Sequence, residues 1–330
     1  MKNKSLYLSR NNQIMAKNIV LIDGFSSSGK TLVAPIISHL KRSEQWQQNE
    51  IYENISILNY FGEISKESVS AILNLESDKS LYYLMIGRNV NFRPTDISSP
   101  SHNNLYEKYY SRTKEIEGDV ISDRIDDINP ILPLHIHYIF GYTDVLLKCF
   151  KDRLKLYMVV LRNPFFLIKT WIEGDWVNRK CNDDRVLDIC FDYFGKEIPW
   201  YTKEYAKEYV EANDYEKSVL TVYNLYIRIF SMYNQLSESE REKMIFIFFE
   251  DFATNPDTCI NKICKILDTE RCDNFETIMQ NLSIPRSLEK CNFISVDELI
   301  EEYRQFLSED IIFKLRELNV SFSNFHKQVK

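Results

Sequence analysis

Three continuous apolar runs stand far apart along the chain. They cover residues 18–23, 154–161 and 244–249; the first ends on Asp23, and the last is followed by Glu250 and Asp251. Apolar runs of this length, without alternation of polar residues, are typical of strands that are buried on both faces of a parallel sheet. We therefore predict three buried strands.

Segments with helical spacing follow these runs. Apolar residues recur at that spacing over residues 31–46, after Pro164 and over residues 259–267. We expect Pro35 in the first turn of the first helix, where its missing N–H costs no hydrogen bond. Residues 175–240, rich in Tyr, Lys and Glu, are expected to add helical cover. Strands separated by helices indicate an α/β fold, in which helices flank a central parallel sheet.

The 330 residues are expected to form a polar N-terminal extension (1–17) and one domain (18–330). No internal repeat, low-complexity tract or clear linker divides the second range. The chain is 44% hydrophobic and 27% charged, which is ordinary for a globular protein with a sizeable core.

Net charge and cysteine content narrow the range of possible functions. A formal net charge of −7 argues against a general binder of nucleic acid or anionic membranes. The seven cysteines include no CxxC pair, and we expect them to be reduced. No apolar run approaches the roughly 18 residues of a membrane span, and the polar start does not resemble a secretory signal. A cytoplasmic protein without a membrane span is expected.

The glycine-containing segment after the first predicted strand carries the clearest chemistry. Residues 24–31 fit the pattern G-x-x-x-x-G-K-[ST] at every fixed position, and they lie between a predicted strand and a predicted helix. Glycines allow successive N–H groups to point into one concavity, while the helix dipole and the lysine favour bound phosphate. The fold is therefore expected to be P-loop NTPase-like and three-layered. The predicted nucleotide-binding residues of this loop are Gly24, Ser26, Ser27, Ser28, Gly29, Lys30 and Thr31.

Two later blocks change the expected nucleotide. Arg162, Asn163 and Pro164 end the second predicted strand, and Thr170 lies eight residues after the arginine. This block resembles the 3′-phosphate-binding motif of sulfotransferases, L-R-N-P followed by a serine at that offset. The planar fork of an arginine suits a phosphate, and a hydroxyl on the following helix completes the clamp. Residues 249–267 look like the family's third conserved segment, which organises structure more than chemistry.

Three blocks in the family's order, spread over residues 18–267, thus resemble sulfotransferases. The resemblance implies a P-loop enzyme that uses 3′-phosphoadenosine 5′-phosphosulfate and needs no metal. It would transfer a sulfuryl group to a hydroxyl or amine of a small-molecule or carbohydrate acceptor. An exposed aromatic surface could support a homodimer.

The loop departs from the family's pattern, which usually reads [K/R]-S-G-T-[T/S]. When Ser28 and Gly29 are aligned with its S-G pair, Ser27 stands where the basic residue belongs. The lysine comes two places after the serine, as Lys30. Whether Lys30 replaces the family's usual loop lysine is left open.

Sulfuryl transfer also requires a base that takes the acceptor's proton. Cytosolic sulfotransferases use a histidine some twenty-odd residues before the arginine of the second block. His137 lies twenty-five residues before Arg162, and His135 twenty-seven. In heparan-type members a glutamate after the P-loop helix does this work, and Glu53 occupies that region. The predicted catalytic residues are His137, Lys30 and Glu53, with His135 as the alternative histidine.

A polar loop could contribute to the acceptor site. Residues 86–96 are dense in hydrogen-bonding groups, and Arg88, Asn91 and Arg93 could line a pocket for an anionic or sugar-like group.

Two other functions fit parts of the sequence. A small-molecule kinase or NTPase using Mg-ATP is favoured by the unbroken loop motif. It is also favoured by Glu250 and Asp251, which follow a strand as a Walker B carboxylate does. A non-catalytic nucleotide-binding protein would explain the missing basic residue at position 27.

Overall fold

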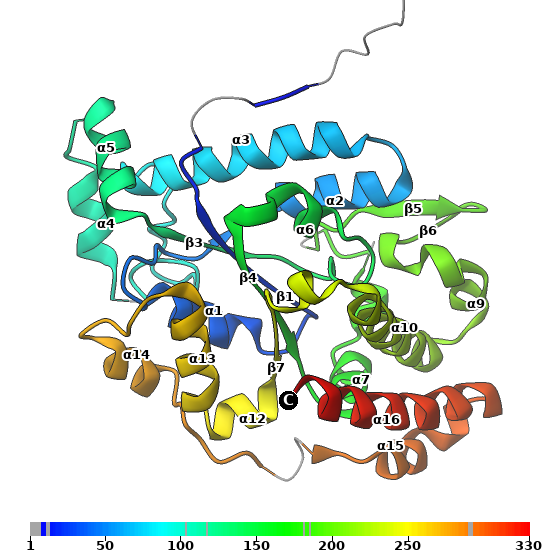
Figure 1. Cartoon of the computed structure of the whole chain (residues 1–330). Coiled ribbons are helices and arrows are strands. Elements are labelled where there is room, and N and C mark those ends of the chain that lie inside the picture. Colours follow the sequence, from blue (N-terminus) through cyan, green and yellow to red (C-terminus); the bar gives the residue numbers. More distant parts are fainter. Residues whose placement is uncertain are drawn as a thin grey trace, which may run out of the picture.

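A five-stranded parallel sheet forms the middle layer of the molecule (Figure 1). The computed structural model describes residues 8–10, 14–102, 104–116, 118–180, 182–184, 186–289 and 293–330. In spatial order the strands are β2 (Gln47–Gln48), β3 (Ile131–His135), β1 (Asn18–Gly24), β4 (Leu154–Leu161) and β7 (Met244–Phe248). The three predicted strands are β1, β4 and β7. They are neighbours at the centre and on one side of the sheet.

Alternate residues of each strand enter different hydrophobic cores. Ile19 and Leu21 of β1 belong to the larger core on one face of the sheet, and Val20 and Ile22 to the smaller core on the other. All four side chains are fully buried. Because both faces of the sheet are covered, no position of the strand has to be polar, which is why the run is continuous in the sequence.

The helices divide between the two cores. Helices of the smaller core are α1 (Lys30–Ser38), α12 (Phe249–Thr254), α13 (Asp257–Leu267) and α14 (Phe275–Asn281). Helices of the larger core are α2 (Ile51–Phe61), α3 (Lys66–Met85), α4 (Tyr106–Arg112), α5 (Asp119–Ile128), α6 (Val145–Phe150), α7 (Pro164–Glu173), α8 (Trp176–Arg179), α9 (Ala206–Glu211), α10 (Asp214–Gln235), α15 (Val296–Tyr303) and α16 (Glu309–Val329). Short elements complete the chain: η1 (Lys151–Arg153), η2 (Trp200–Tyr205), α11 (Glu238–Arg241) and η4 (Arg304–Phe306). The predicted three-layer, P-loop NTPase-like α/β fold is confirmed.

The first helix is shorter than the sequence predicts. It ends at Ser38, and Pro35 lies in its second turn, as the sixth residue. The carbonyl oxygen of Pro35 lies 2.8 Å from Nδ1 of His39 at the helix end. Beyond it, the backbone of Ser43 pairs with that of Ile131 of β3. Apolar spacing continues past Ser38, but pairing with the sheet takes the place of the helix.

The prediction of helical cover over residues 175–240 is wrong for part of that stretch. It contains an antiparallel hairpin of β5 (Cys190–Tyr193) and β6 (Lys196–Pro199). Phe194 and Gly195 between the strands have φ values of 51° and 82°, as a tight hairpin turn requires. The longest helix of the stretch, α10, is predicted correctly and starts with a capping box at Asn213.

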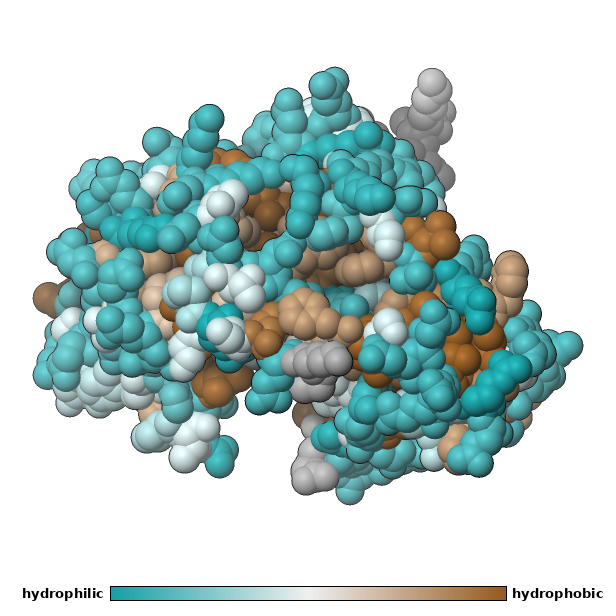
Figure 2. Space-filling view, turned by 90° about the horizontal axis from the view of Figure 1, so that it is seen from below, coloured by the Kyte–Doolittle hydropathy of each residue, from teal (hydrophilic) through white to brown (hydrophobic). Residues whose placement is uncertain are grey.

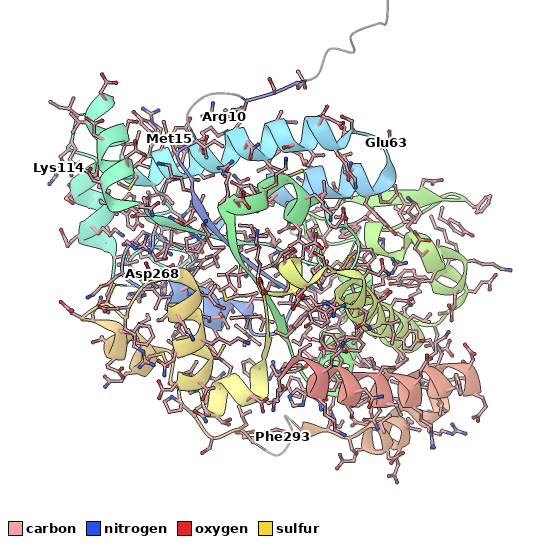
Figure 3. All side chains as sticks on the ribbon, viewed as in Figure 1. Arg10, Met15, Glu63, Lys114, Asp268 and Phe293 are labelled. Atoms are coloured by element: carbon pink, nitrogen blue, oxygen red, sulfur yellow. The ribbon has the colours of Figure 1, made fainter. Side chains whose placement is uncertain are left out.

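The described part of the N-terminal segment is bound to α3 (Figure 3). Oδ1 of Asp78, which is buried on α3, accepts hydrogen bonds from the backbone N–H groups of Met15 (3.1 Å) and Ala16 (3.0 Å). The same carboxylate forms ion pairs with Arg10 and Arg153. Residues 1–7 and 11–13 of the predicted extension lie outside the described residues.

The carboxyl ends of the strands place the functional segments at one edge of the sheet. Because the strands are parallel, β1 runs into the glycine-lysine loop, β4 into Arg162, and β7 into α12 at the same edge. Figure 2 shows this end of the molecule from below, with hydrophobic side chains visible in hollows between hydrophilic ridges.

The packing of the loop against α12 gives a first prediction. Gly29 has a φ of 100°, and a Cβ atom there would lie 2.3 Å from the ring of Phe249. Gly29→Ala should therefore lower the free energy of unfolding in urea by about 1–3 kcal/mol more than Gly62→Ala does. Gly62 is the matched control, because its φ is 83° and nothing lies near its added Cβ atom. Equal losses in the two variants would show that Phe249 does not constrain the loop.

Candidate active site

The glycine-lysine loop has the backbone geometry of an anion-binding turn. Gly24, Ser27 and Gly29 have positive φ values of 149°, 68° and 100°. A Cβ atom on Gly24 would lie 2.5 Å from the carbonyl oxygen of Val160 in β4, so only glycine fits. Turns with such angles bring successive N–H groups into one concavity, and the amino end of α1 opens onto it.

Lys30 is buried at the start of α1, and its amino group turns back onto the loop. Nζ donates hydrogen bonds to the carbonyl oxygens of Gly24 and Phe25, both at 2.8 Å. Burial lowers the pKa of Lys30 to about 7, and the nearby Asp23 and Glu53 carboxyls partly oppose this effect. A bound phosphate would favour the charged ammonium. Lys30 can therefore exchange its carbonyl partners for a phosphate oxygen.

The hydroxyl groups of the loop differ in their surroundings. Ser26 bonds to the Tyr138 hydroxyl through both its backbone N–H, at 3.1 Å, and its Oγ. Oγ of Ser28 is buried and has no hydrogen-bond partner among the described residues. A buried hydroxyl without a partner costs about 1–3 kcal/mol, so an added acceptor such as a phosphate oxygen would stabilise the loop here. Thr31 is exposed in the first turn of α1.

Arg162 reaches from the end of β4 back to the loop. Its Nη1 donates to the carbonyl oxygen of Ser27 at 3.1 Å. Its Cζ lies 3.9 Å from the ring centroid of Phe166 and 4.3 Å from that of Phe249. Thr170 is on the same helix as Phe166, and its hydroxyl donates to the Phe166 carbonyl oxygen at 2.9 Å. Both members of the predicted 3′-phosphate pair thus contact Phe166.

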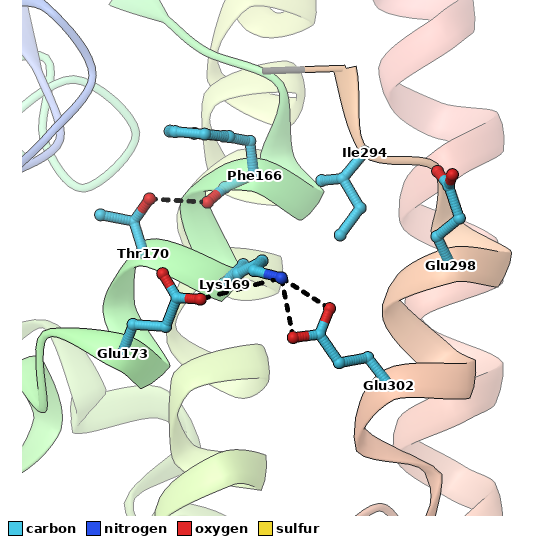
Figure 4. Close-up of a pocket in the computed structure, with 7 residues that line it drawn as sticks. All are labelled: Phe166, Lys169, Thr170, Glu173, Ile294, Glu298 and Glu302. Carbon is cyan, nitrogen blue, oxygen red and sulfur yellow. Dashed lines mark hydrogen bonds and ion pairs between the residues drawn. The ribbon is translucent and has the colours of Figure 1, made fainter. Parts of the chain in front are cut away.

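Thr170 also lines a cavity of about 640 Å³ between α7 and α15 (Figure 4). The lining residues are Phe166, Lys169, Thr170, Glu173, Ile294, Glu298 and Glu302. Nζ of Lys169 already bonds both carboxylate oxygens of Glu302, each at 2.7 Å. A phosphate here would face three carboxylates and one engaged lysine, which is unfavourable. The space beside Arg162, where its guanidinium meets the glycine-lysine loop, is the better place for an anion.

Arg286 is a cation near the loop that the sequence analysis missed. Its Cζ lies 5.6 Å from the ring centroid of Phe249, the ring that Arg162 also contacts. Its backbone N–H is fixed by the carbonyl oxygen of Ala253 at 2.8 Å. Arg286 belongs to none of the three sequence blocks, so no spacing signal marks it.

A second cavity, of about 290 Å³, opens beside Ser26 of the loop. Two of the predicted bases, Glu53 of α2 and His137 after β3, line it. The complete lining comprises Ser26, Gln48, Glu50, Glu53, Asn54, Ile57, His137, Tyr138, Lys180, Leu187, Asp188, Ile189 and Trp200. We call this space the acceptor cavity. It joins the loop to both candidate bases.

The two rival bases form one hydrogen-bonded pair. Nδ1 of His137 lies 2.9 Å from Oε1 of Glu53. The alternative histidine, His135, is 1% exposed and packs with its ring centroid 5.1 Å from that of Trp46. Its ring centroid lies 4.8 Å from that of His137, yet His135 does not line the acceptor cavity. Of the two histidines, His137 is therefore the one that can reach an acceptor.

Burial keeps this pair uncharged at neutral pH. It raises the pKa of Glu53 to about 8, and the nearby Asp23 adds to this effect. Burial and the charge of Lys30 hold the pKa of His137 well below its usual range. While Glu53 is protonated it donates to Nδ1, so that the proton of His137 is on Nε2. Once Glu53 ionises, Nδ1–H donates to it and Nε2 becomes a free base.

Several lining residues come from stretches in which the sequence showed no chemistry. Lys180 follows α8, with Nζ bonded to Asp188 and 5.4 Å from the ring centroid of Tyr138. Trp200 begins η2 after the hairpin. Of these residues, only Tyr138 could have been singled out from the sequence, because it directly follows the two histidines. The others reach the cavity through tertiary packing, which residue spacing does not encode.

The polar loop at residues 86–96 is not brought to the acceptor cavity. Nδ2 of Asn91 donates to Oγ of Ser98 at 2.8 Å, and Nε of Arg93 donates to Oγ1 of Thr95 at 3.3 Å. Neither these residues nor Arg88 is among the described residues that line the cavity. The polar groups of Asn91 and Arg93 instead organise the loop itself.

The carboxylates that would hold magnesium in a kinase have partners in the protein. Oε1 of Glu250 accepts from the backbone N–H of Asn163 at 2.9 Å. Oδ2 of Asp251 lies 3.1 Å from Nε2 of His326 and 2.7 Å from Nζ of Lys330. Over the part of the chain that the structure describes, no three His, Cys, Asp or Glu side chains are grouped to hold a metal ion.

One expectation about the cysteines is wrong. Cys190 at the start of β5 is disulfide-bonded, although the sequence analysis expected reduced thiols throughout. Among the cysteines that the structure describes, Cys149, Cys259, Cys264 and Cys272 are free. As for membrane spans, the described helices include none with both the length and the apolar character that crossing a bilayer requires.

Comparison with known proteins finds similarity to solved structures only. No protein-family model and no curated protein matches the chain. It is similar to the sulfotransferase domain from the curacin biosynthetic pathway, with 13% identity, a TM-score of 0.44, and 93% of this chain and 97% of that domain covered. It is also similar to the sulfotransferase domain of the Synechococcus PCC 7002 olefin synthase, with 11% identity, a TM-score of 0.41, and 97% and 98% covered. A third similar structure is sulfotransferase STF9 from Mycobacterium avium, with 11% identity and a TM-score of 0.41. The similarity covers 90% of this chain and 77% of that chain.

The raised pKa of Glu53 gives a second prediction. A carboxyl whose pKa is raised by folding contributes its full stabilisation at pH values below its pKa in the unfolded chain. That contribution is lost as the pH rises through the folded-state pKa, which is about 8 for Glu53. Glu53→Gln cannot ionise, so its stability advantage over the natural protein should grow with pH. In chemical denaturation the difference in unfolding free energy should be small near about pH 4 and reach about 4–5 kcal/mol by about pH 9.

Exposed Glu63 is the matched control, and Glu63→Gln should show no such growth. If both substitutions gave flat differences across this range, Glu53 would not be a carboxyl that burial keeps neutral.

Proposed function

We propose that this chain is a sulfotransferase-like enzyme. It transfers a sulfuryl group from 3′-phosphoadenosine 5′-phosphosulfate to a hydroxyl or amine of a compact acceptor. The observation that carries the proposal is that the Glu53–His137 pair and Ser26 of the glycine-lysine loop line one cavity. A base and a phosphate cradle that border the same cavity suit the transfer of a group from a nucleotide to an acceptor.

The residues around the loop fit this donor. The concavity and Lys30 would hold the 5′-phosphate, and Oγ of Ser28 would gain the acceptor that it lacks. Arg162, at the end of β4, would hold the 3′-phosphate, with Thr170 as the hydroxyl from the helix that follows. The Phe166 and Phe249 rings already fix the guanidinium plane, which lowers the entropy cost of binding.

The transfer step needs one proton acceptor and one stabilised leaving group. The acceptor oxygen or nitrogen forms a bond to sulfur while the bond from sulfur to the 5′-phosphate oxygen breaks. The electron pair of the broken bond stays on that oxygen, where Lys30 and the loop N–H groups offset the charge. The acceptor's proton passes to Nε2 of His137. Ionised Glu53 then stabilises the imidazolium through Nδ1–H.

The acceptor cavity suits a small polar molecule. About 290 Å³ holds a small molecule or one to two sugar rings, and its wall includes the amides of Gln48 and Asn54 beside the Trp200 indole. Amides and an aromatic ring together favour a hydroxyl-rich acceptor, in agreement with a small-molecule or carbohydrate substrate.

A kinase or NTPase is the second candidate, because residues 24–31 match the nucleotide-binding motif without interruption. Against it, Glu250 and Asp251 already bond to Asn163, His326 and Lys330. A protein that binds the nucleotide without turnover is a third candidate, and it would leave the Glu53–His137 pair without a role.

Nucleotide choice tests the proposal. Calorimetry should show that adenosine 3′,5′-bisphosphate binds without magnesium and more tightly than ATP with or without magnesium. Arg162→Ala should weaken the bisphosphate by about tenfold to a hundredfold, since a charge-assisted hydrogen bond is lost. It should change the affinity for adenosine 5′-phosphate little.

Arg93→Ala, on the exposed loop, is the matched control and should leave both affinities unchanged. Magnesium-dependent binding of ATP in preference to the bisphosphate would contradict the proposal and favour a kinase. Equal losses for the two ligands in Arg162→Ala would remove the assignment of the 3′-phosphate to Arg162.

The base gives a further prediction, measured with an acceptor found by screening with labelled donor. His137→Ala should lower turnover by about two to four orders of magnitude, the usual contribution of a positioned base. Nucleotide affinity should stay unchanged, because the imidazole serves the acceptor. Turnover of the natural protein should rise with pH through about 8, as Glu53 ionises and frees Nε2.

Glu53→Gln should remove that rise, and exposed His102→Ala is the control for loss of a histidine elsewhere. Full turnover in His137→Ala together with a complete loss in Glu53→Gln would assign the proton transfer to the carboxylate alone.

A further inference from the structure

A second buried lysine approaches the loop from outside it. The side chain of Lys180 is only 4% exposed, although the residue lies just beyond the short helix α8. Its Nζ bonds to Asp188, whose side chain is 26% exposed. A lysine is rarely buried to this extent without a specific reason, because its charge loses hydration.

Lys180 and Lys30 both lie near Tyr138, which connects the loop to the acceptor cavity. Nζ of Lys180 is 5.4 Å, and Nζ of Lys30 6.0 Å, from the ring centroid of Tyr138. The hydroxyl of Tyr138 is bonded to Ser26 of the loop. The charge of Lys180 acts on Lys30 and on His137. Two lysine amino groups therefore lie near Tyr138, where the loop meets the acceptor cavity.

The two lysines face different spaces. Nζ of Lys30 is held inside the loop by the carbonyl oxygens of Gly24 and Phe25, and Lys30 does not line the acceptor cavity. Lys180 lines that cavity together with Ser26 and His137. Lys30 is thus positioned for the phosphate within the loop. Lys180 is positioned for whatever group projects from the loop toward the base.

We propose that Lys180 is a catalytic residue that binds the sulfuryl group during its transfer. This inference rests on the proposed sulfotransferase activity. The sulfuryl group carries three oxygens that share negative charge, and a cation fixed at the cavity wall would hold them while the bond to the phosphate breaks. Lys180 exchanges Asp188 for these oxygens, and the partly exposed Asp188 carboxylate remains hydrated.

A binding experiment tests this without a known acceptor. Two ligands are compared by calorimetry: 3′-phosphoadenosine 5′-phosphosulfate, which carries the sulfuryl group, and adenosine 3′,5′-bisphosphate, which lacks it. Lys180→Met keeps an unbranched side chain only one atom shorter and removes the charge. It should weaken binding of the phosphosulfate by about tenfold to a hundredfold, as expected for loss of a charged hydrogen bond. Binding of the bisphosphate should weaken much less.

Two further variants separate recognition from structure. Lys169→Met is the matched control, because Lys169 is ion-paired with Glu302 at the other cavity, and it should change neither affinity. Asp188→Asn keeps the ammonium and weakens its competing partner, so it should tighten the phosphosulfate selectively. This variant also decides the question if Lys180→Met does not fold.

The outcomes distinguish this inference from the function on which it rests. Failure of the natural protein to bind either ligand would overturn the proposed function. The natural protein could instead bind both ligands, while each of the two variants, Lys180→Met and Asp188→Asn, changes the affinities for both ligands equally. That result would be compatible with the proposed function and would show that Lys180 is only a structural partner of Asp188. A selective change in the phosphosulfate supports the assignment.

Discussion

Burial of charge at the carboxyl end of β1 is the constraint on which the site depends. Lys30 is enclosed where the strand turns into α1, and its charge loses hydration there. The loop compensates with the carbonyl oxygens of Gly24 and Phe25, which accept hydrogen bonds from Nζ. These compensating groups are weaker partners for an ammonium than a phosphate. A phosphate at the loop, as we propose, would favour the charged form of Lys30.

Burial also shifts the pKa values of the two candidate base residues, Glu53 and His137. In water a glutamate and a histidine would both titrate well below pH 8, and the pair would carry charge. Here burial raises the pKa of Glu53 and lowers that of His137, so the neutral hydrogen-bonded pair persists to higher pH. Glu53 thereby decides which nitrogen of His137 carries a proton. A carboxyl whose ionised form destabilises the fold is difficult to explain as a structural feature, and it fits a functional role.

Tyr138 connects the two halves of the site. Its hydroxyl holds Ser26 of the loop, while the amino groups of Lys30 and Lys180 lie near its ring. The residue immediately before it is His137. One tyrosine thus connects the glycine-lysine loop with the candidate base and with Lys180. The parallel sheet makes this possible, because it brings the ends of β1 and β3 to the same edge.

The sequence by itself determined the central strands, the glycine-lysine loop and the identity of the residues that could act as base. These features are local: buried strands need continuous apolar runs, and a phosphate turn needs glycines at fixed spacing. Only the tertiary structure decided that Glu53 and His137 are partners rather than rivals, and that Lys180 lies beside them. It also ended α1 at Ser38 and kept the polar loop at residues 86–96 away from the cavity. Contacts between segments far apart in the chain depend on how the helices pack over the sheet, and no residue spacing records that packing.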